Sequence, residues 1–228
     1  MSATQMNEAV RLTLPEELVL FALDDESGKL VEALGGPASL NLAIAGAMLM
    51  ELELRGRVDS DSNRLFAVNE SPTGVALLDE VLGLIVSEPK QLSSEAWLNR
   101  LASNGDAMRA QLISSLVARG ILREERKRLL WVLTIRAYPP VSGREELEVR
   151  ARILELLEGD DIPEAHDALL VGLLHATGLF VVMLSEAQLQ SLRPRIVAVT
   201  NLEEISRSLG GSVRRLQEIL VASLMAVY

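Results

Sequence analysis

The feature that most constrains the fold of this 228-residue chain is an apolar run at residues 42–50, LAIAGAMLM. A helix that spans a bilayer needs about 20 consecutive apolar residues, and here Glu51 and Glu53 closely follow the run. A second apolar segment, residues 168–184, is interrupted by His175 and two glycines. Both segments therefore predict helices that are buried on nearly all sides within a helical bundle, rather than membrane spans.

The composition also favours a helical protein. Hydrophobic residues make up 49% of the chain but aromatic residues only 3%, so Leu, Ala, Val and Ile must fill the core, and these favour helix packing over a β-sandwich. Helix start signals recur at the capping boxes Thr13/Glu16, Ser142/Glu145 and Ser185/Gln188, and at Pro37, Pro72 (after an N-cap at Ser71) and Pro163. We expect a mainly α fold, with a central bundle of buried apolar helices surrounded by amphipathic helices, in a single domain over residues 12–228 after a short tail at 1–11.

Two segments predict β-hairpins. In residues 57–68, RVDSDSNRLFAV, a polar turn separates two apolar pieces. In residues 121–135 a charged turn separates two apolar pieces, and the second piece is rich in the β-branched and aromatic residues that favour strands. Pro139 and Pro140 end this second hairpin.

The overall charge and the cysteine content argue against several functions. The net charge is −10, so phosphates repel the molecule as a whole, and no general affinity for nucleic acid is expected. The chain has no cysteine, which leaves no disulfides and no thiolate chemistry. Residues 1–18 have neither the basic nor the apolar region of a signal peptide. These features predict a cytoplasmic protein.

Catalytic and metal-binding patterns are not evident in the sequence. His166 and His175 are nine residues apart, a spacing that does not place them on one helix face as a zinc-binding i, i+4 pair requires. The glycines before Ser212 lack the lysine of a phosphate-binding loop, and no Ser/His/acid arrangement can be assembled. The acids at 24–26 are typical of a solvated helix end. We therefore expect no metal, no cofactor and no enzymatic activity.

One segment differs in sign from the rest of the molecule. Residues 119–136 carry a local charge of +4, because six basic residues oppose Glu124 and Glu125. One interpretation is a hairpin edge protected by solvated charges. The other is a surface for docking or oligomerisation that binds an anionic partner such as lipid headgroups, with the tryptophan at the interface. The residues of this candidate hairpin surface are Arg123, Arg126, Lys127, Arg128 and Trp131.

Five sequence blocks, in their order and spacing, resemble the Golgi phosphoprotein family. They are LTLPEELVLFALDDESGKL (12–30), AGAMLMELELRGRV (45–58), SPTGVALLDEVL (71–82), LVARGILREERKRLLWV (116–132) and LLHA (173–176). Eukaryotic members of this family are peripheral Golgi adaptors that recognise phosphatidylinositol-4-phosphate and hold the cytosolic tails of glycosyltransferases. The resemblance implies buried apolar helices wrapped by amphipathic ones, and a protruding β-hairpin that mediates oligomerisation.

The same resemblance implies a lipid site that is only partly retained. In eukaryotic members a Trp and an Arg precede the MLMELELRGR part of the second block (residues 48–57), and two basic residues three apart lie on the helix before the fourth block. Aligned on the blocks, these positions fall near Gly36 and on Ala45, Asp106 and Arg109. A phosphorylated headgroup needs several charge-assisted donors. Arg109 alone keeps the cation, and it is therefore the expected headgroup-binding residue.

The sequence leaves three functions open. The first is a non-catalytic adaptor at the membrane periphery that binds an anionic lipid headgroup or protein tails and associates with itself through the hairpin. The second is a DNA-binding regulator, because helices followed by a basic hairpin mimic a winged helix; its plausible groove contacts are Arg109, Gln111 and Arg119. The third, an enzyme, has no supporting constellation. The first is the function that the sequence favours.

Overall fold

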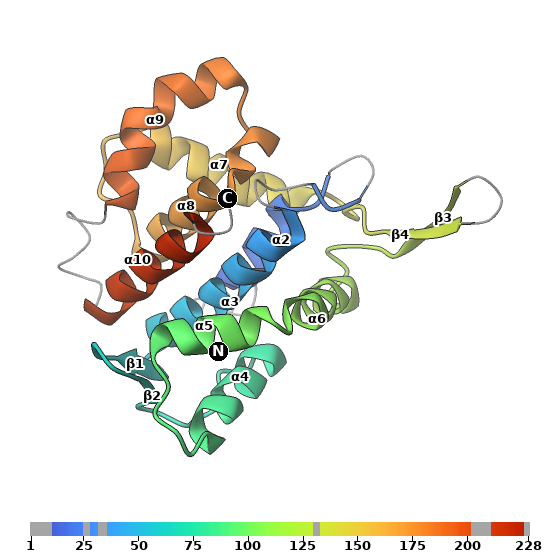
Figure 1. Ribbon diagram of the computed structural model, residues 1–228. Coiled ribbons are helices and arrows are strands. Elements are labelled where there is room, and N and C mark those ends of the chain that lie inside the picture. The colour runs from blue at the N-terminus through green and yellow to red at the C-terminus, as the bar shows by residue number, and fades with distance from the viewer. Residues whose placement is uncertain (1–10, 25–27, 32–35, 130–132, 202–210, 226–228) are drawn as a thin grey trace, which may run out of the picture.

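The computed structural model describes residues 11–24, 28–31, 36–129, 133–201 and 211–225, and for 126–129, 133–135, 211 and 212 it describes the backbone alone. The protein is mainly helical, as predicted (Figure 1). The elements in chain order are α2 (Leu14–Phe21), α3 (Gly36–Leu54), β1 (Val58–Ser60), β2 (Leu65–Ala67), α4 (Ala76–Ser87), α5 (Ser94–Ala102), α6 (Gly105–Ala118), β3 (Glu125–Leu129), β4 (Leu133–Ala137), α7 (Arg144–Glu158), α8 (Ala165–Thr177), the 3-10 helix η1 (Leu179–Val182), α9 (Glu186–Thr200) and α10 (Gly211–Met225).

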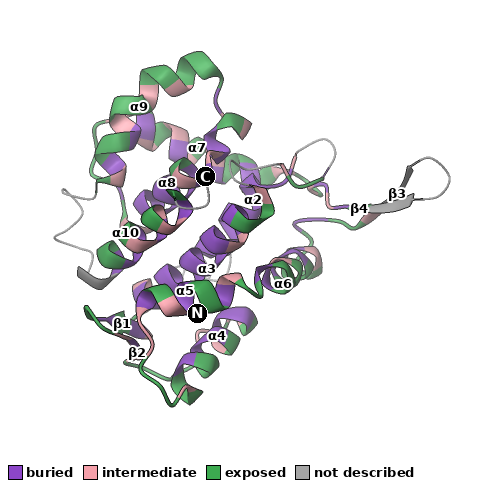
Figure 2. Ribbon diagram, in the orientation of Figure 1, coloured by how far each residue is buried: buried purple, intermediate pink, exposed green. Residues whose placement is uncertain are grey.

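The apolar helix α3 lies at the centre of the molecule. Residues 42–53 are all buried, as the purple ribbon of α3 in Figure 2 shows. Helix α3 contacts α2, α4, α5, α6, α8 and α10. The second apolar helix, α8, is buried over residues 167–174. The buried helix predicted at residues 42–50 is confirmed. The segment at 168–184 is only partly a buried helix, because α8 ends at Thr177, Gly178 has a φ of +70° and the 3-10 helix η1 follows, in which Val181 is 63% exposed. Among the helices that the structure describes, none is long and apolar enough to cross a membrane.

Helix α10 packs on both apolar helices at glycine positions. A Cβ atom at Gly46 of α3 would lie 2.6 Å from Leu220 Cδ2, and one at Gly172 of α8 would lie 2.3 Å from Gln217 Nε2. Because glycine has no Cβ, α10 approaches α3 and α8 closely enough to bury its own apolar face against them. Gly46 and Gly172 therefore have a packing role.

Several predicted helix starts need correction. The capping boxes at the starts of α2 and α9 are confirmed. Ser71 is not an N-cap, because Gly74 with a φ of +82° interrupts the backbone and α4 begins only at Ala76. In α7 the N-cap is Gly143 rather than Ser142, and α8 begins two residues after Pro163. Each error is a matter of local backbone geometry, which residue spacing alone does not reveal.

The second predicted hairpin exists but is shifted along the chain. The prediction covered residues 121–135, whereas the strands β3 and β4 pair antiparallel over 125–129 and 133–137. Ile121 and Leu122 are buried in the core, so they hold the hairpin to the helical body instead of entering it. Figure 1 shows the hairpin projecting away from the helices. The first hairpin, β1–β2, lies within its predicted range.

Candidate functional site

The predicted headgroup residue Arg109 lies in the second turn of α6, within a cluster of three polar side chains. Its Nη1 atom donates to Asn41 Oδ1 at 2.6 Å, and its Nη2 atom donates to Asp106 Oδ1 at 2.9 Å. Asn41 Nδ2 donates to the same Asp106 oxygen at 3.0 Å. The Arg109 side chain is only 14% exposed, whereas that of Asp106 is 77% exposed. In this Asn41–Asp106–Arg109 cluster the carboxylate is the outer group and the guanidinium the inner one.

A glycine at the start of α6 brings this cluster together. A Cβ atom at Gly105 would lie 2.3 Å from Asn41 Cβ, so only glycine lets α6 begin this close to α3. A hydrogen bond from Asn41 and the charge of Arg109 hold the pKa of Asp106 below its usual range. Asp106 is therefore an anion at neutral pH, in the first turn of a helix, where negative charge is favourable.

A cavity of about 630 Å³ adjoins the cluster between α3, α5 and α10. Asn41 belongs both to its wall and to the cluster, and Glu95 is the charged residue in the wall. A carboxylate at the wall and a second one at Asp106 make this region unfavourable for a phosphate unless one of them moves. The cavity is lined by Ala38, Asn41, Leu42, Glu95, Asn99, Ala102, Ile219, Ala222 and Ser223.

The hairpin places the predicted docking residues Arg126, Lys127 and Arg128 on strand β3, while Trp131 lies outside the described residues. The strand register sets Arg126 opposite Arg136 and Arg128 opposite Thr134. Successive residues of a strand alternate between its two faces. Positions 126, 128 and 136 therefore share one face of the ladder.

The base of the hairpin carries less free positive charge than the sequence count suggests. Arg123 Nη2 lies 3.0 Å from Glu125 Oε1, and Arg136 Nε lies 3.8 Å from Glu124 Oε1. The two arginine side chains are 61% and 67% exposed. Exposed ion pairs of this kind contribute about 0–1 kcal/mol. Both arginines are therefore paired, but weakly enough to exchange partners.

The structure separates Arg109 from the hairpin. Arg109 and Ala118 are nine positions apart along α6, a rise of about 14 Å, and β3 begins only after the helix ends. Arg119, at the C-terminal end of α6, donates to the buried Glu16 of α2 at 2.8 Å. The predicted cations are thus distributed between the two ends of α6 instead of forming one surface.

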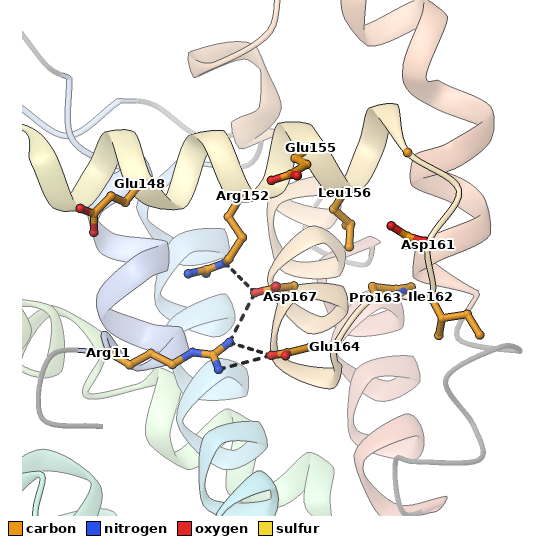
Figure 3. Close-up of a pocket in the computed structure, with 11 residues that line it drawn as sticks. Arg11, Glu148, Arg152, Glu155, Leu156, Asp161, Ile162, Pro163, Glu164 and Asp167 are labelled. Atoms are coloured by element: carbon orange, nitrogen blue, oxygen red, sulfur yellow. Dashed lines mark hydrogen bonds and ion pairs between the residues drawn. The ribbon is translucent and has the colours of Figure 1, made fainter. Parts of the chain in front are cut away.

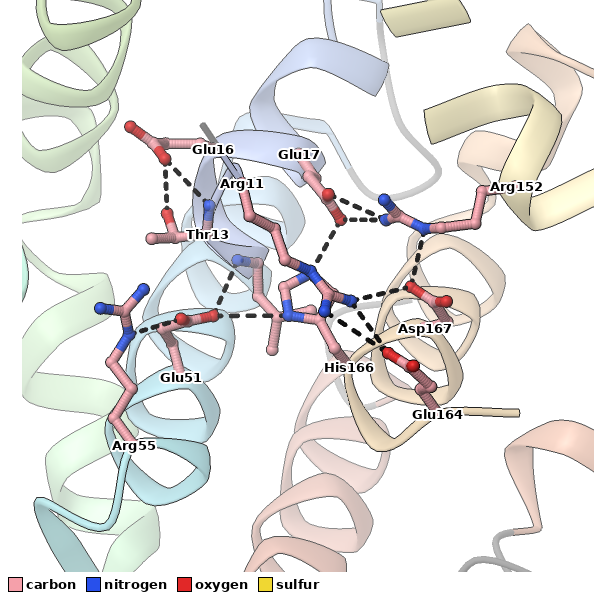
Figure 4. Close-up of polar contacts among 11 residues, drawn as sticks. Arg11, Thr13, Glu16, Glu17, Glu51, Arg55, Arg152, Glu164, His166 and Asp167 are labelled. Carbon is pink, nitrogen blue, oxygen red and sulfur yellow. Dashed lines mark hydrogen bonds and ion pairs between the residues drawn. The ribbon is translucent and has the colours of Figure 1, made fainter. Parts of the chain in front are cut away.

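A polar network that the sequence analysis missed joins α2, α3, α7 and α8 (Figure 4). Both Glu17 oxygens accept from Arg152 Nη2, at 2.9 and 3.0 Å, and Glu17 Oε2 also lies 3.0 Å from His166 Nε2. His166 Nδ1 is 3.8 Å from Glu51 Oε2, and Glu51 Oε1 accepts from Arg55 at 2.7 Å. Glu51, directly after the apolar run, was the one sequence signal for this network, since a buried acid needs partners.

Burial shifts the pKa values at the edge of this network. Burial raises the pKa of Asp167, although Arg152, His166 and Arg11 lie nearby. Burial by itself lowers the pKa of Arg152, but Glu17 and then Asp167 raise it overall. Because Arg152 shares its charge between two carboxylates, Asp167 is left incompletely compensated.

A second cavity, of about 660 Å³, opens beside this network (Figure 3). Five carboxylates and two guanidiniums line it: Glu148, Glu155, Asp161, Glu164 and Asp167, with Arg11 and Arg152. The arginines are directed at Asp167 and Glu164, as the dashed lines in Figure 3 show. This excess of negative charge repels phosphate groups, so the cavity is not suited to a phosphorylated headgroup.

The two histidines lie in different surroundings. Within the described ranges, no three His, Cys, Asp or Glu side chains are grouped so that they could hold a metal ion. His166 lies between Glu17 and Glu51 in the polar network, and His175 is on the exposed side of α8.

The protein has a helical body built around a buried apolar helix, and a β-hairpin with exposed arginines projects from that body. This places it in the class of helical proteins with a projecting hairpin. Comparison with known proteins identifies the class further. The chain belongs to the Golgi phosphoprotein 3 (GPP34) family, whose model matches residues 14–219. The sequence resemblance is thereby confirmed.

Two relatives are both described as vacuolar protein sorting-associated protein 74. The protein of Eremothecium gossypii is 35% identical over 167 residues, which cover 64% of this chain and 49% of the relative. The protein of Schizosaccharomyces pombe is 29% identical over 181 residues, which cover 68% of this chain and 53% of the relative. The matched region thus spans about half the length of these relatives.

The family assignment gives no support to the DNA-binding alternative, and the described contacts of α6 argue against it. All three side chains predicted as groove contacts already bond to acids. Arg109 bonds to Asp106, Gln111 Nε2 lies 3.5 Å from Glu80 Oε2, and Arg119 bonds to Glu16. Groove recognition relies on side chains that are available to the DNA, whereas these three are engaged with acids of the protein itself.

Proposed function

We propose that this protein is a non-catalytic adaptor of the Golgi phosphoprotein family that binds peripherally to an anionic membrane surface from the cytoplasm. The observation that supports the proposal most directly is the projecting hairpin, whose base holds Arg123 and Arg136 in exposed, weak ion pairs. Arg109 is the proposed headgroup ligand. Short protein tails and a second copy of the chain, bound through the hairpin surface, are the proposed protein partners.

The energetic basis of this proposal is an exchange of ion pairs. An exposed intramolecular pair contributes about 0–1 kcal/mol, whereas a cation close to an anionic lipid surface contributes about 1 kcal/mol, and several such contributions add up. The interaction free energy of the hairpin arginines is therefore more favourable at a membrane with many phosphates than in the ion pairs with Glu124 and Glu125. The net charge of −10 opposes this attraction, so binding must be local and orientation-dependent.

A vesicle co-sedimentation series tests the proposal. We expect association with vesicles that contain phosphatidylinositol-4-phosphate, little association with zwitterionic vesicles, and weaker binding as salt rises. The double variant Arg123→Ala, Arg136→Ala is expected to bind roughly tenfold or more weakly, because two cations near the surface are lost. Absence of binding to the anionic vesicles at low salt contradicts the proposal.

The matched control is the double variant Arg64→Ala, Arg214→Ala. These arginines also form exposed ion pairs, with Asp61 and Glu218, but they lie outside the β3–β4 hairpin. The control removes the same net charge, so a general electrostatic effect weakens both double variants equally. A specific hairpin effect weakens the first far more than the second.

A further inference from the structure

We propose that Asp106 competes with anionic headgroups for Arg109. The Asp106 carboxylate binds the guanidinium that a headgroup otherwise binds, and it thereby limits the affinity of this site for phosphorylated ligands. The inference rests on the proposed function, because it assigns a regulator to the proposed headgroup residue. It concerns the strength of binding at Arg109 and leaves the role of the hairpin unchanged.

The contacts of Asp106 are those that a phosphate group would make. Arg109 Nη2 and Asn41 Nδ2 both donate to Asp106 Oδ1, at 2.9 and 3.0 Å. Arginine binds carboxylate and phosphate oxygens with the same donor geometry. One oxygen of Asp106 thus occupies a position where an amide and a guanidinium donor converge, which is the arrangement that a phosphate oxygen requires.

The order of the groups from solvent inward makes this competition unavoidable. Asp106 is 77% exposed and Arg109 only 14%, so an anion that approaches from solvent meets the carboxylate before the guanidinium. It reaches Arg109 only after Asp106 has moved aside. Until then, like charges repel it.

Release of Asp106 needs only a side-chain rotation. In this i, i+3 pair the carboxylate of Asp106 is the exposed partner, at 77%, so water can replace the guanidinium that it leaves. When Asp106 leaves, the Asn41 oxygen still accepts from Arg109 Nη1 and keeps the guanidinium in place. The two described hydrogen bonds use two of the five N–H donors of Arg109, which leaves donors for an incoming oxyanion.

The decisive variant is Asp106→Asn, because it removes the charge and keeps the size. Its amide oxygen can still accept from Asn41 and Arg109, so the local contacts persist while the competition weakens. The matched control is Asp61→Asn. Asp61 is an exposed acid three residues before Arg64, with 3.2 Å between Asp61 Oδ2 and Arg64 Nε, so the control makes the same charge change at the same spacing in another part of the molecule.

Binding to vesicles that contain phosphatidylinositol-4-phosphate is the measurement. We expect Asp106→Asn to bind roughly fivefold more tightly than the unmodified chain, since a like charge is removed from the approach to Arg109. The gain is expected to disappear in the double variant Asp106→Asn, Arg109→Ala. Asp61→Asn is expected to increase the affinity for these vesicles much less than Asp106→Asn does.

Each other outcome has a distinct meaning. If the unmodified chain binds and Asp106→Asn does not bind more tightly, the competitor role is wrong and the proposed adaptor function stands. If Asp61→Asn gains as much as Asp106→Asn, net charge explains the result and the competitor role is again wrong. If neither the unmodified chain nor Asp106→Asn binds at low salt, both proposals are wrong. Unfolding midpoints of all variants, with Asp106→Ser as a second neutral variant, separate a folding defect from a loss of competition.

Discussion

The polar network between α2, α3, α7 and α8 and the Asn41–Asp106–Arg109 cluster on α6 are built from the same residue types, but water reaches them differently. In the network, the Glu17 side chain is 1% exposed and bonds to Arg152 and His166. In the cluster, the Asp106 side chain is 77% exposed and bonds to one arginine and one amide. Burial therefore distinguishes two charged regions that look alike in the sequence.

The difference shows how stability and binding are divided in this protein. Removal of one partner from a buried ion pair leaves an uncompensated charge in a medium that solvates it poorly, so such a pair must stay intact. An exposed pair can open at little cost, because water replaces the lost partner. The buried network thus fixes the packing of α2, α7 and α8 around α3, and the exposed pairs remain available for exchange with a ligand.

The largest expected effect belongs to the centre of the network. Glu17→Gln removes the negative charge that faces Arg152 and leaves that guanidinium with Asp167 as its one remaining carboxylate partner. We expect a loss of about 3 kcal/mol in the free energy of unfolding, measured by urea denaturation. The matched change Glu124→Gln at the hairpin base removes an exposed pair and is expected to cost less than about 1 kcal/mol. Similar losses for the two variants would contradict the division into a structural and an exchangeable region.

The next effect concerns the contact that assembles the cluster. Gly105→Ala places a Cβ where Asn41 Cβ and Cα already lie, at 2.3 and 3.0 Å. We expect a loss of about 1–3 kcal/mol, with displacement of α6 from α3 and weaker binding at Arg109. The control is Gly83→Ala in α4, where nothing lies within 4 Å of the new Cβ and a gain of about 0.5–1 kcal/mol is expected. An equal change in the free energy of unfolding for the two variants would show that the close approach of α6 to α3 at Gly105 does not contribute to stability.

The smallest effect is a difference in acid titration between the two regions. The pKa of Asp106 is lowered by Asn41 and Arg109, so its contribution to stability is present above the ordinary aspartate pKa and is lost as pH falls through the lower, folded value. The pKa of Asp167 is raised by burial, so stability falls as pH rises from the ordinary value to the higher, folded one. Carboxyl carbon NMR is expected to give midpoints below and above the ordinary value, respectively.

The variant Arg109→Ala sharpens this titration. It removes one cause of the lowered pKa of Asp106 and leaves Asp167 untouched, so only the Asp106 midpoint is expected to rise. An unchanged Asp106 midpoint would indicate that the Asn41 hydrogen bond alone holds the carboxylate, and that Arg109 is not its main electrostatic partner.

Much of the fold could be predicted because the signals were local. The length of the apolar run at 42–50 and the acids after it were sufficient to predict a buried helix. The capping boxes located the starts of α2 and α9. The start of α4 could not be predicted in this way, because the φ of Gly74 is set by the path of the loop before it. For the same reason the hairpin begins after Ile121 and Leu122, which the core retains.

The candidate site was less predictable, since its geometry depends on contacts between residues that are far apart in the chain. The sequence by itself determined a mainly helical protein with a buried apolar helix and a basic hairpin, because periodicity, capping and charge are local properties. Only the tertiary structure decided that Asn41, distant in sequence, meets Asp106 and Arg109, and that Glu17 and Arg152 form a buried pair. Burial and distance between side chains are products of packing, and they decide which charges hold the fold together and which can bind a partner.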